Sequence, residues 1–176
     1  MILKPQDIML ALKLLARGSM SCTFAQLGQE LGISASEANQ AFHRARRAGL
    51  ITPSDDLPVK SAMAELLIHG LKYFLPVQPG GRTRGIPTGF AAPPLNASFA
   101  SSRNDSDVLV WPDPEGDRAG LEIRPLCRSA PGAAKRDAIL YEWLVLADAL
   151  RGAGRARERK LAENIVRKRL DYHASR

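Results

Sequence analysis

Residues 23–51 constrain the fold of this chain more than any other stretch. Their order of apolar, small and polar residues suits two short helices that meet at a tight turn. The first helix is expected over Phe24–Leu31, and Gly32 supplies a residue that can end it in the left-handed conformation. Ser34 and Glu37 follow at the spacing of a capping box, which satisfies free amide groups at a helix start. A second helix is therefore predicted to begin directly after Ser34.

The predicted second helix has a polar face that suits contact with the DNA major groove. The residues expected to lie largely on this face are Ser36, Asn39, Gln40, His43, Arg44 and Arg47. Asn and Gln side chains can pair with adenine edges, Arg with guanine edges or phosphate, and Ser with either. A solvated amphipathic helix without a nucleic-acid partner is the alternative. The capping box, the turn glycine and the cluster that Arg44 forms with Arg46 and Arg47 favour DNA recognition.

The segment resembles the helix-turn-helix of bacterial winged-helix transcriptional regulators of the MarR-like kind. The resemblance covers about the first third of the chain, and its matching positions are Leu27, the turn at residues 32–34, and residues 48–51, where such folds enter a strand. In that family a leading helix, here Pro5–Arg17, packs behind the pair. The resemblance implies a winged helix-turn-helix that binds double-stranded DNA through the helix over Ala35–Ala48.

Two features depart from the pattern of that family. Gly28 stands where alanine is usual, and glycine inside a helix costs about 0.5–1 kcal/mol relative to alanine. Residues 52–60, in the place of the wing, are short and acidic with two prolines, so the wing is expected to be a stub or absent. Residues 79–85 offer flexible backbone and two cations, Arg82 and Arg84, which could serve as the missing wing by contacting the DNA backbone.

Charge is distributed unevenly along the 176 residues, whose formal net charge is +7. Residues 1–51 carry six Lys or Arg and three Asp or Glu, residues 52–150 carry ten and twelve, and residues 151–176 carry nine and three. A basic end beside a helix-turn-helix favours phosphate binding, because each neutralised phosphate releases condensed counterions. A solvated helix face is the alternative for the C-terminal stretch.

Several function classes are disfavoured by what the sequence lacks. No apolar run approaches the roughly 18 residues of a membrane helix, and the first residues lack a secretory signal pattern, so a cytoplasmic protein is expected. Cys22 and Cys127 are far apart and have no C-x-x-C partner, so reduced thiols are expected. The three histidines lie in separate segments and no catalytic motif is present. We therefore expect no enzyme, no cofactor and no metal site.

The predicted fold class is mainly α, in three segments. An N-terminal (winged) helix-turn-helix domain is expected over residues 1–75, including a helix near residues 61–73. Residues 76–132 are rich in Pro, Gly, Ser and Asn and predict an irregular strap or linker with room for short strands. The apolar side chains of this segment favour docking onto the helices. Its runs at 79–95 and 111–117 resemble bacterial proteins that carry a similar helix-turn-helix, a likeness that brings no known chemistry.

The third segment, residues 133–176, is predicted to be helical. One helix is expected over Ala133–Arg151 and a second resumes after a break at residues 152–154. Their apolar faces either fold back onto the core of the protein or pack against a second copy. Dimerisation is favoured, because two-fold regulators space two recognition helices about one DNA turn apart.

The sequence thus predicts a sequence-specific DNA-binding transcriptional regulator, a homodimeric repressor. The residues expected to contact bases or the groove are Ser36, Asn39, Gln40, His43 and Arg44, and those expected to bind phosphate are Arg46, Arg47, Arg82 and Arg84. The alternative is a protein-interaction adaptor, or an antitoxin-like module of a toxin-antitoxin or defence system, in which the helix-turn-helix is kept as scaffold.

Overall fold

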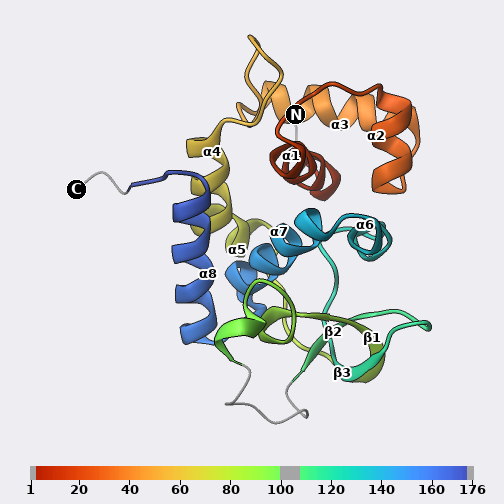
Figure 1. Ribbon diagram of the computed structural model, residues 1–176, viewed down its shortest axis with the longest axis vertical. Coiled ribbons are helices and arrows are strands. Elements are labelled where there is room, and N and C mark those ends of the chain that lie inside the picture. The colour runs from red at the N-terminus through yellow and green to blue at the C-terminus, as the bar shows by residue number, and fades with distance from the viewer. Residues whose placement is uncertain (1–2, 100–107, 174–176) are drawn as a thin grey trace. The chain divides into compact units, whose positions relative to one another are not determined.

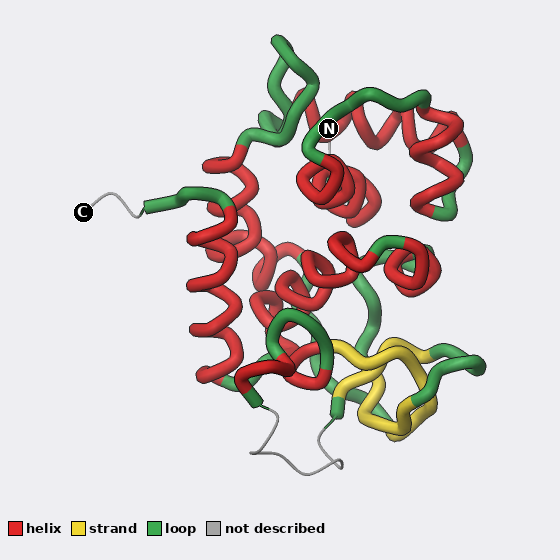
Figure 2. The backbone as a smooth tube through the Cα atoms, viewed as in Figure 1, coloured by secondary structure: helices red, strands yellow, loops and turns green. Residues whose placement is uncertain are grey.

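The computed structural model of the protein describes residues 3–99 and 108–173. The described chain is mainly helical with one small sheet, as Figure 2 shows. It divides into two compact units, each made from two stretches of sequence: unit 1 from residues 1–63 and 126–144, and unit 2 from residues 64–125 and 145–176. The units do not follow the linear order of the three predicted segments, because the chain returns to unit 1 after the sheet.

Unit 1 contains the predicted pair of helices and the helix that precedes them. Its first three helices are α1 (Pro5–Arg17), α2 (Phe24–Leu31) and α3 (Ala35–Arg47), as Figure 1 shows. These bounds confirm the helices predicted over the same residues. The side chains of Leu27, Leu31 and Phe42 are buried between them, which explains the apolar spacing of the sequence.

Capping boxes fix where α2 and α3 begin. The Ser34 hydroxyl accepts a hydrogen bond from the Glu37 amide (3.1 Å), and the Glu37 carboxylate accepts one from the Ser34 amide (3.1 Å). Thr23 and Gln26 form the same reciprocal pair at the start of α2, at 3.2 and 2.9 Å. Caps of this kind contribute about 1 kcal/mol each, so both helix starts are well determined.

Gly28 lies against the turn between α2 and α3. Its carbonyl accepts a hydrogen bond from the amide of Ile33 (2.9 Å), and a Cβ on Gly28 would stand 2.8 Å from the carbonyl oxygen of Ile33. Side-chain carbons do not approach backbone that closely, so any larger residue would push the turn away. Glycine at this position therefore has a structural reason, because close packing against the turn offsets the propensity cost of glycine in a helix.

We expect Gly28→Ala to lower the free energy of unfolding by about 1–3 kcal/mol, the usual cost of overpacking, although helix propensity alone would predict a gain. Gly132 in helix α6 (Ala130–Arg136) is the matched control, because a Cβ there would meet nothing nearer than Arg136 Nη1 at 3.8 Å. Gly132→Ala should stabilise the protein by about 0.5–1 kcal/mol. Urea unfolding compares the two variants, and a Gly28→Ala protein at least as stable as wild type would refute the packing argument.

A short hairpin follows α3. The helix ends at Arg47, and two residues later Gly49, with a φ of 78°, allows the Leu50 amide to reach the Ala45 carbonyl (3.0 Å). Residues 50–59 then turn back on themselves, with a β-bridge between Ile51 and Pro58 and a hydrogen bond from the Val59 amide to the Leu50 carbonyl (2.9 Å). In Figure 1 this hairpin is the loop between α3 and α4. The segment expected to be a stub or absent is therefore a short, ordered hairpin.

The predicted helix over residues 133–151 is wrong in one respect. It is divided into α6 (Ala130–Arg136) and α7 (Ala138–Asp148) by Asp137, whose backbone is extended. The Asp137 carboxylate accepts hydrogen bonds from the amides of Ile139 and Leu140 (both 3.0 Å), so it caps the start of α7.

The Asp137 carboxylate also binds a buried cation of α1. Lys13 Nζ lies 2.5 Å from Asp137 and 2.8 Å from Glu30 of α2. The hydrogen bond from Lys13 lowers the pKa of Glu30. Burial acts to raise the pKa of the Asp137 carboxyl, but the hydrogen bonds from Lys13 and from the amides of Leu140 and Ile139, together with the charge of Lys13, lower it. One lysine thus ties α1, α2 and the start of α7 together.

Unit 2 is built around a three-stranded sheet. The predicted helix at 61–73 is confirmed as a longer one, in which α4 (Lys60–Glu65) passes through a π-helical turn at Leu66–Gly70 into α5 (Leu71–Phe74). The strands are β1 (Arg82–Thr88), β2 (Leu109–Pro112) and β3 (Arg118–Glu122). Short 3-10 turns lie at Gly89–Ala91 and Asn96–Ser98. After α7, a π-helical turn at Ala149–Ala153 leads to α8 (Ala156–Arg169).

The sheet closes on itself. β1 pairs antiparallel with both β2 and β3, and β2 pairs parallel with β3, so Gly85 lies opposite both Pro112 and Arg118. A Cβ at Gly85 or Gly120 would collide with the backbone of β2 or the residue before it, so only glycine permits this tight closure. The described part of the segment predicted as an irregular strap or linker with room for short strands therefore contains three short strands, paired in one sheet, and two 3-10 turns.

A buried ion pair joins the end of α7 to the sheet. Asp148 is fully buried, and its carboxylate accepts hydrogen bonds from Thr88 Oγ1 and Trp111 Nε1 (both 2.7 Å) and from Arg151 Nε (2.9 Å). Arg151 also donates to the carbonyls of Leu75 and Arg124. Burial raises the pKa of Asp148, while the charge of Arg151 and the other hydrogen bonds oppose that rise.

Candidate nucleic-acid interface

One line of exposed polar side chains runs along α3. Ser36, Gln40, His43 and Arg47 are all exposed, and their spacing of four, three and four residues puts them on one face of the helix. The line extends over roughly 16 Å at the α-helical rise. Asn39 lies beside it and is half-buried. Five of the six residues predicted to face outward are thus at or near one surface of α3.

Neighbouring contacts hold this line in place. Gln40 Nε2 donates to Ser36 Oγ (3.3 Å), so the amide lies along the helix axis. The His43 ring packs near two phenylalanines, with centroids 5.5 Å from Phe42 and 6.3 Å from Phe24. Phe24 and Phe42 also contact each other edge to face at 5.5 Å, which links the core of the unit to its surface.

Arg44 does not lie with this group. Its guanidinium binds the carboxylate of Asp7 on α1 through Nε and Nη2, at 2.7 to 3.1 Å. The Asp7 side chain is completely buried and that of Arg44 is 14% exposed. The hydrogen bonds that Arg44 donates to Asp7 raise the pKa of Arg44. Arg44 was predicted to point outward and contact bases, whereas in the structure its partner is α1.

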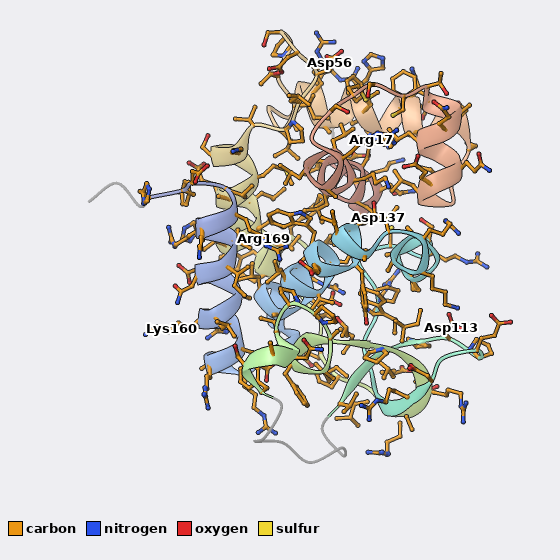
Figure 3. The ribbon with its side chains drawn as sticks, viewed as in Figure 1. Arg17, Asp56, Asp113, Asp137, Lys160 and Arg169 are labelled. Carbon is orange, nitrogen blue, oxygen red and sulfur yellow. The ribbon has the colours of Figure 1, made fainter. Side chains whose placement is uncertain are left out.

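Arg46 connects α3 to the hairpin at residues 50–59. Its guanidinium donates to the carbonyl of Pro53 (2.9 Å) and lies 3.4 Å from the carboxylate of Asp56, which Figure 3 labels in the hairpin. Asp55 stands beside it, and hydrogen bonds from Thr52 and Leu57 lower the pKa of the Asp55 carboxyl. Two carboxylates therefore lie in the hairpin, and negative charge disfavours a close approach of phosphate there.

Arg82 and Arg84, the other predicted phosphate contacts, belong to β1 of unit 2. Both are exposed, and Arg84 Nη1 donates to the Gly116 carbonyl (3.3 Å) in the loop between β2 and β3. That loop is acidic, and Asp113 in it donates its amide to the Arg84 carbonyl (3.1 Å; Figure 3). The structure does not bring Arg82 and Arg84 together with α3 in one unit. The hairpin that follows α3 is made by residues 50–59.

The sequence did not predict that Asp7 binds Arg44. Asp7 and Arg44 are 37 residues apart, so no pattern of neighbouring residues in the sequence indicates that they pair. One signal was present: Asp7 is a carboxylate in the first turn of a helix whose following residues are almost all apolar. A charged residue on such a buried stripe needs a partner, and Arg44 is a cation on the helix packed against it.

Other kinds of site find little support in residues 3–99 and 108–173. There, no group of three or more His, Cys, Asp and Glu side chains is placed to hold a metal ion. Both cysteines, Cys22 and Cys127, are thiols, and Cys127 Sγ donates to Met9 Sδ (3.2 Å). No helix in the same part of the chain has the length and apolar character needed to cross a bilayer.

The exposed line on α3 is therefore the candidate interface, and its interpretation depends on its own geometry. A scan against models of protein families finds no match to the chain, and searches of curated proteins and of solved structures find no similar protein.

Proposed function

We propose that this protein is a sequence-specific DNA-binding transcriptional regulator that inserts α3 into the major groove. The observation that carries the proposal is the line of Ser36, Gln40, His43 and Arg47 on one exposed face of a helix that is capped at its start and packed on its opposite face. A rigid helix with hydrogen-bonding and cationic groups along one face matches what the groove presents.

Each residue of the line has a role that its chemistry suits. Gln40 is placed to pair with an adenine edge, and Arg47 with a guanine edge or a phosphate. Ser36 and His43 can hydrogen-bond to either bases or backbone, as can Asn39 at the side of the line. In this proposal the hairpin at residues 50–59 takes the place of the wing, and its carboxylates keep it from acting as a phosphate clamp.

The proposal includes a homodimeric repressor, because two copies would place two recognition helices on two half-sites. The apolar residues of α7, such as Leu140 and Leu144, are fully buried within the single chain, so a contact between copies would use other surfaces. Among the described residues the exposed large apolar side chains are Tyr73, Phe74 and Ile139. Sedimentation at several protein concentrations tests for the dimer, and a monomer at all of them would refute it.

The substitution Gln40→Ala tests whether α3 recognises the bases of DNA. We expect it to weaken binding to a fragment spanning the promoter of its own gene by about 1–3 kcal/mol, roughly 5- to 150-fold. Binding to a random duplex of equal length should hardly change, because the lost contact is to a base. Fluorescence anisotropy at several salt concentrations measures both affinities.

Gln29→Ala is the matched control, because Gln29 is an exposed glutamine on α2 of the same unit. It should leave both affinities unchanged. Equal losses on the two duplexes for Gln40→Ala would contradict base reading. A wild-type protein that binds no DNA at moderate salt but forms a stable complex with another protein would favour the adaptor or antitoxin-like alternative instead.

A further inference from the structure

The exposed surface of α8 is strongly cationic. Five of its basic side chains are exposed, namely Arg155, Arg157, Arg159, Lys160 and Lys168. The same stretch holds two carboxylates, of which Glu158 is buried and Glu163 is paired with Arg167 (2.7 Å). Figure 3 labels Lys160 on this helix.

The spacing of α8 separates this surface from the core of unit 2. Ala162, Val166 and Leu170 recur every four residues and are buried. Lys160, Asn164 and Lys168 recur at the same interval, offset by two residues, and are exposed. An offset of two residues corresponds to roughly 200° around the helix, so Lys160 and Lys168 lie opposite the packed side.

The basic residues of the last turn of α8, Arg167, Lys168 and Arg169, favour the helix macrodipole, but most of the charge at its N-terminal end does not. Basic residues at the start of a helix oppose its macrodipole, and each costs a few tenths of a kcal/mol up to about 1 kcal/mol. Arg155, Arg157, Arg159 and Lys160 all lie at the N-terminal end of α8. A group of cations held against the local electrostatics points to an anionic partner outside the helix.

The chemistry of the surface indicates which anionic partner fits. None of the exposed large apolar side chains among the described residues lies on α8, so the helix offers no apolar anchor for a lipid surface or for the desolvated centre of a protein interface. Arginine, lysine and asparagine are the side chains that contact the phosphates and sugars of nucleic acid. The exposed cations span roughly 20 Å of helix, over which a duplex presents about twelve phosphate charges.

We infer that the exposed face of α8 is a second DNA-binding surface, which holds the phosphate backbone of a duplex without reading its sequence. The inference rests on the proposed DNA-binding function and adds to it a separate source of affinity. It assigns sequence preference to α3 and much of the salt dependence to α8.

The test uses the full chain with Lys160→Gln and Lys168→Gln combined. We expect weaker binding to random and promoter duplexes by the same factor, and a slope of log affinity against log salt that is shallower by about 2. The charge-matched control is Lys72→Gln with Arg124→Gln, two exposed cations of unit 2 outside α8, which should leave the slope unchanged. Lys160→Arg with Lys168→Arg should retain wild-type binding.

The outcomes separate this inference from the proposed function. If the α8 variant and its control bind random duplex equally well, the inference fails, whether or not the wild type prefers its promoter. If the wild type shows no promoter preference but the α8 variant still loses affinity and slope, sequence-specific regulation fails and the inference stands. A loss confined to the promoter duplex would also overturn it, because a backbone contact carries no sequence preference.

Discussion

Asp148→Ala is expected to lower the free energy of unfolding by about 3–5 kcal/mol, the usual cost of removing one partner from a buried ion pair. The substitution would leave the guanidinium of Arg151, which is 3% exposed, without its counter-charge, and would remove the acceptor for Thr88 and Trp111. Urea unfolding followed by circular dichroism measures the loss. Hydrogen exchange should show it concentrated in the sheet, because the carboxylate links α7 to β1 and β2.

Two companion variants show whether the buried charge is the cause. Thr88→Val removes one donor and leaves the ion pair, so a smaller loss of about 1–3 kcal/mol is expected. Asp148→Leu with Arg151→Met removes both charges and should recover much of the stability that Asp148→Ala loses. If the double variant were the least stable of the three, packing around Asp148 would be the dominant contribution and the ion-pair explanation would fail.

Arg44→Ala is expected to cost about 3 kcal/mol of unfolding free energy, because it leaves the carboxylate of Asp7 buried without its partner. Arg47→Ala is the matched control: it removes the same charge from the same helix at an exposed position. Its effect on stability should stay within about 0.5 kcal/mol. Thermal or urea unfolding of the two variants side by side makes the comparison.

The same pair of variants separates folding from DNA reading. Under conditions where both proteins are folded, Arg47→Ala should weaken binding to DNA, whereas Arg44→Ala should retain the ratio of promoter to random affinity. An Arg44→Ala protein with wild-type stability and no promoter preference would return Arg44 to the set of base-reading residues. The experiment therefore tests the most specific difference between the sequence-based site and the structure.

The first three helices of unit 1 could be predicted because their signals are local. A capping box, a turn glycine and apolar side chains at helical spacing all act within a few residues of one another, and together they determine α2 and the start of α3. The same helical periodicity predicted most of the exposed polar residues on α3. The hairpin after α3 was harder to predict. Its strands pair through a single β-bridge, and its prolines and carboxylates are residues that are rare in strands.

What could not be predicted depends on contacts between distant residues. Whether Arg44 points to solvent or to Asp7 is decided by how α1 packs on α3, and periodicity places the residue near that boundary without resolving it. The strands of unit 2 are short and interrupted by glycine and proline, so they lack the alternation that identifies a strand in sequence. Asp148 lies in an apolar helix, where a lone carboxylate does not reveal its partners on β1 and β2.

The closed sheet of unit 2 also limits how the protein can recruit other chains. Each strand is paired with the other two, so the sheet offers no terminal strand on which an extended peptide could continue the hydrogen-bonded ladder. Strand addition is a common route both to peptide recognition and to aggregation. Neither route is open through this sheet, and a partner that binds unit 2 would have to be recognised by side chains.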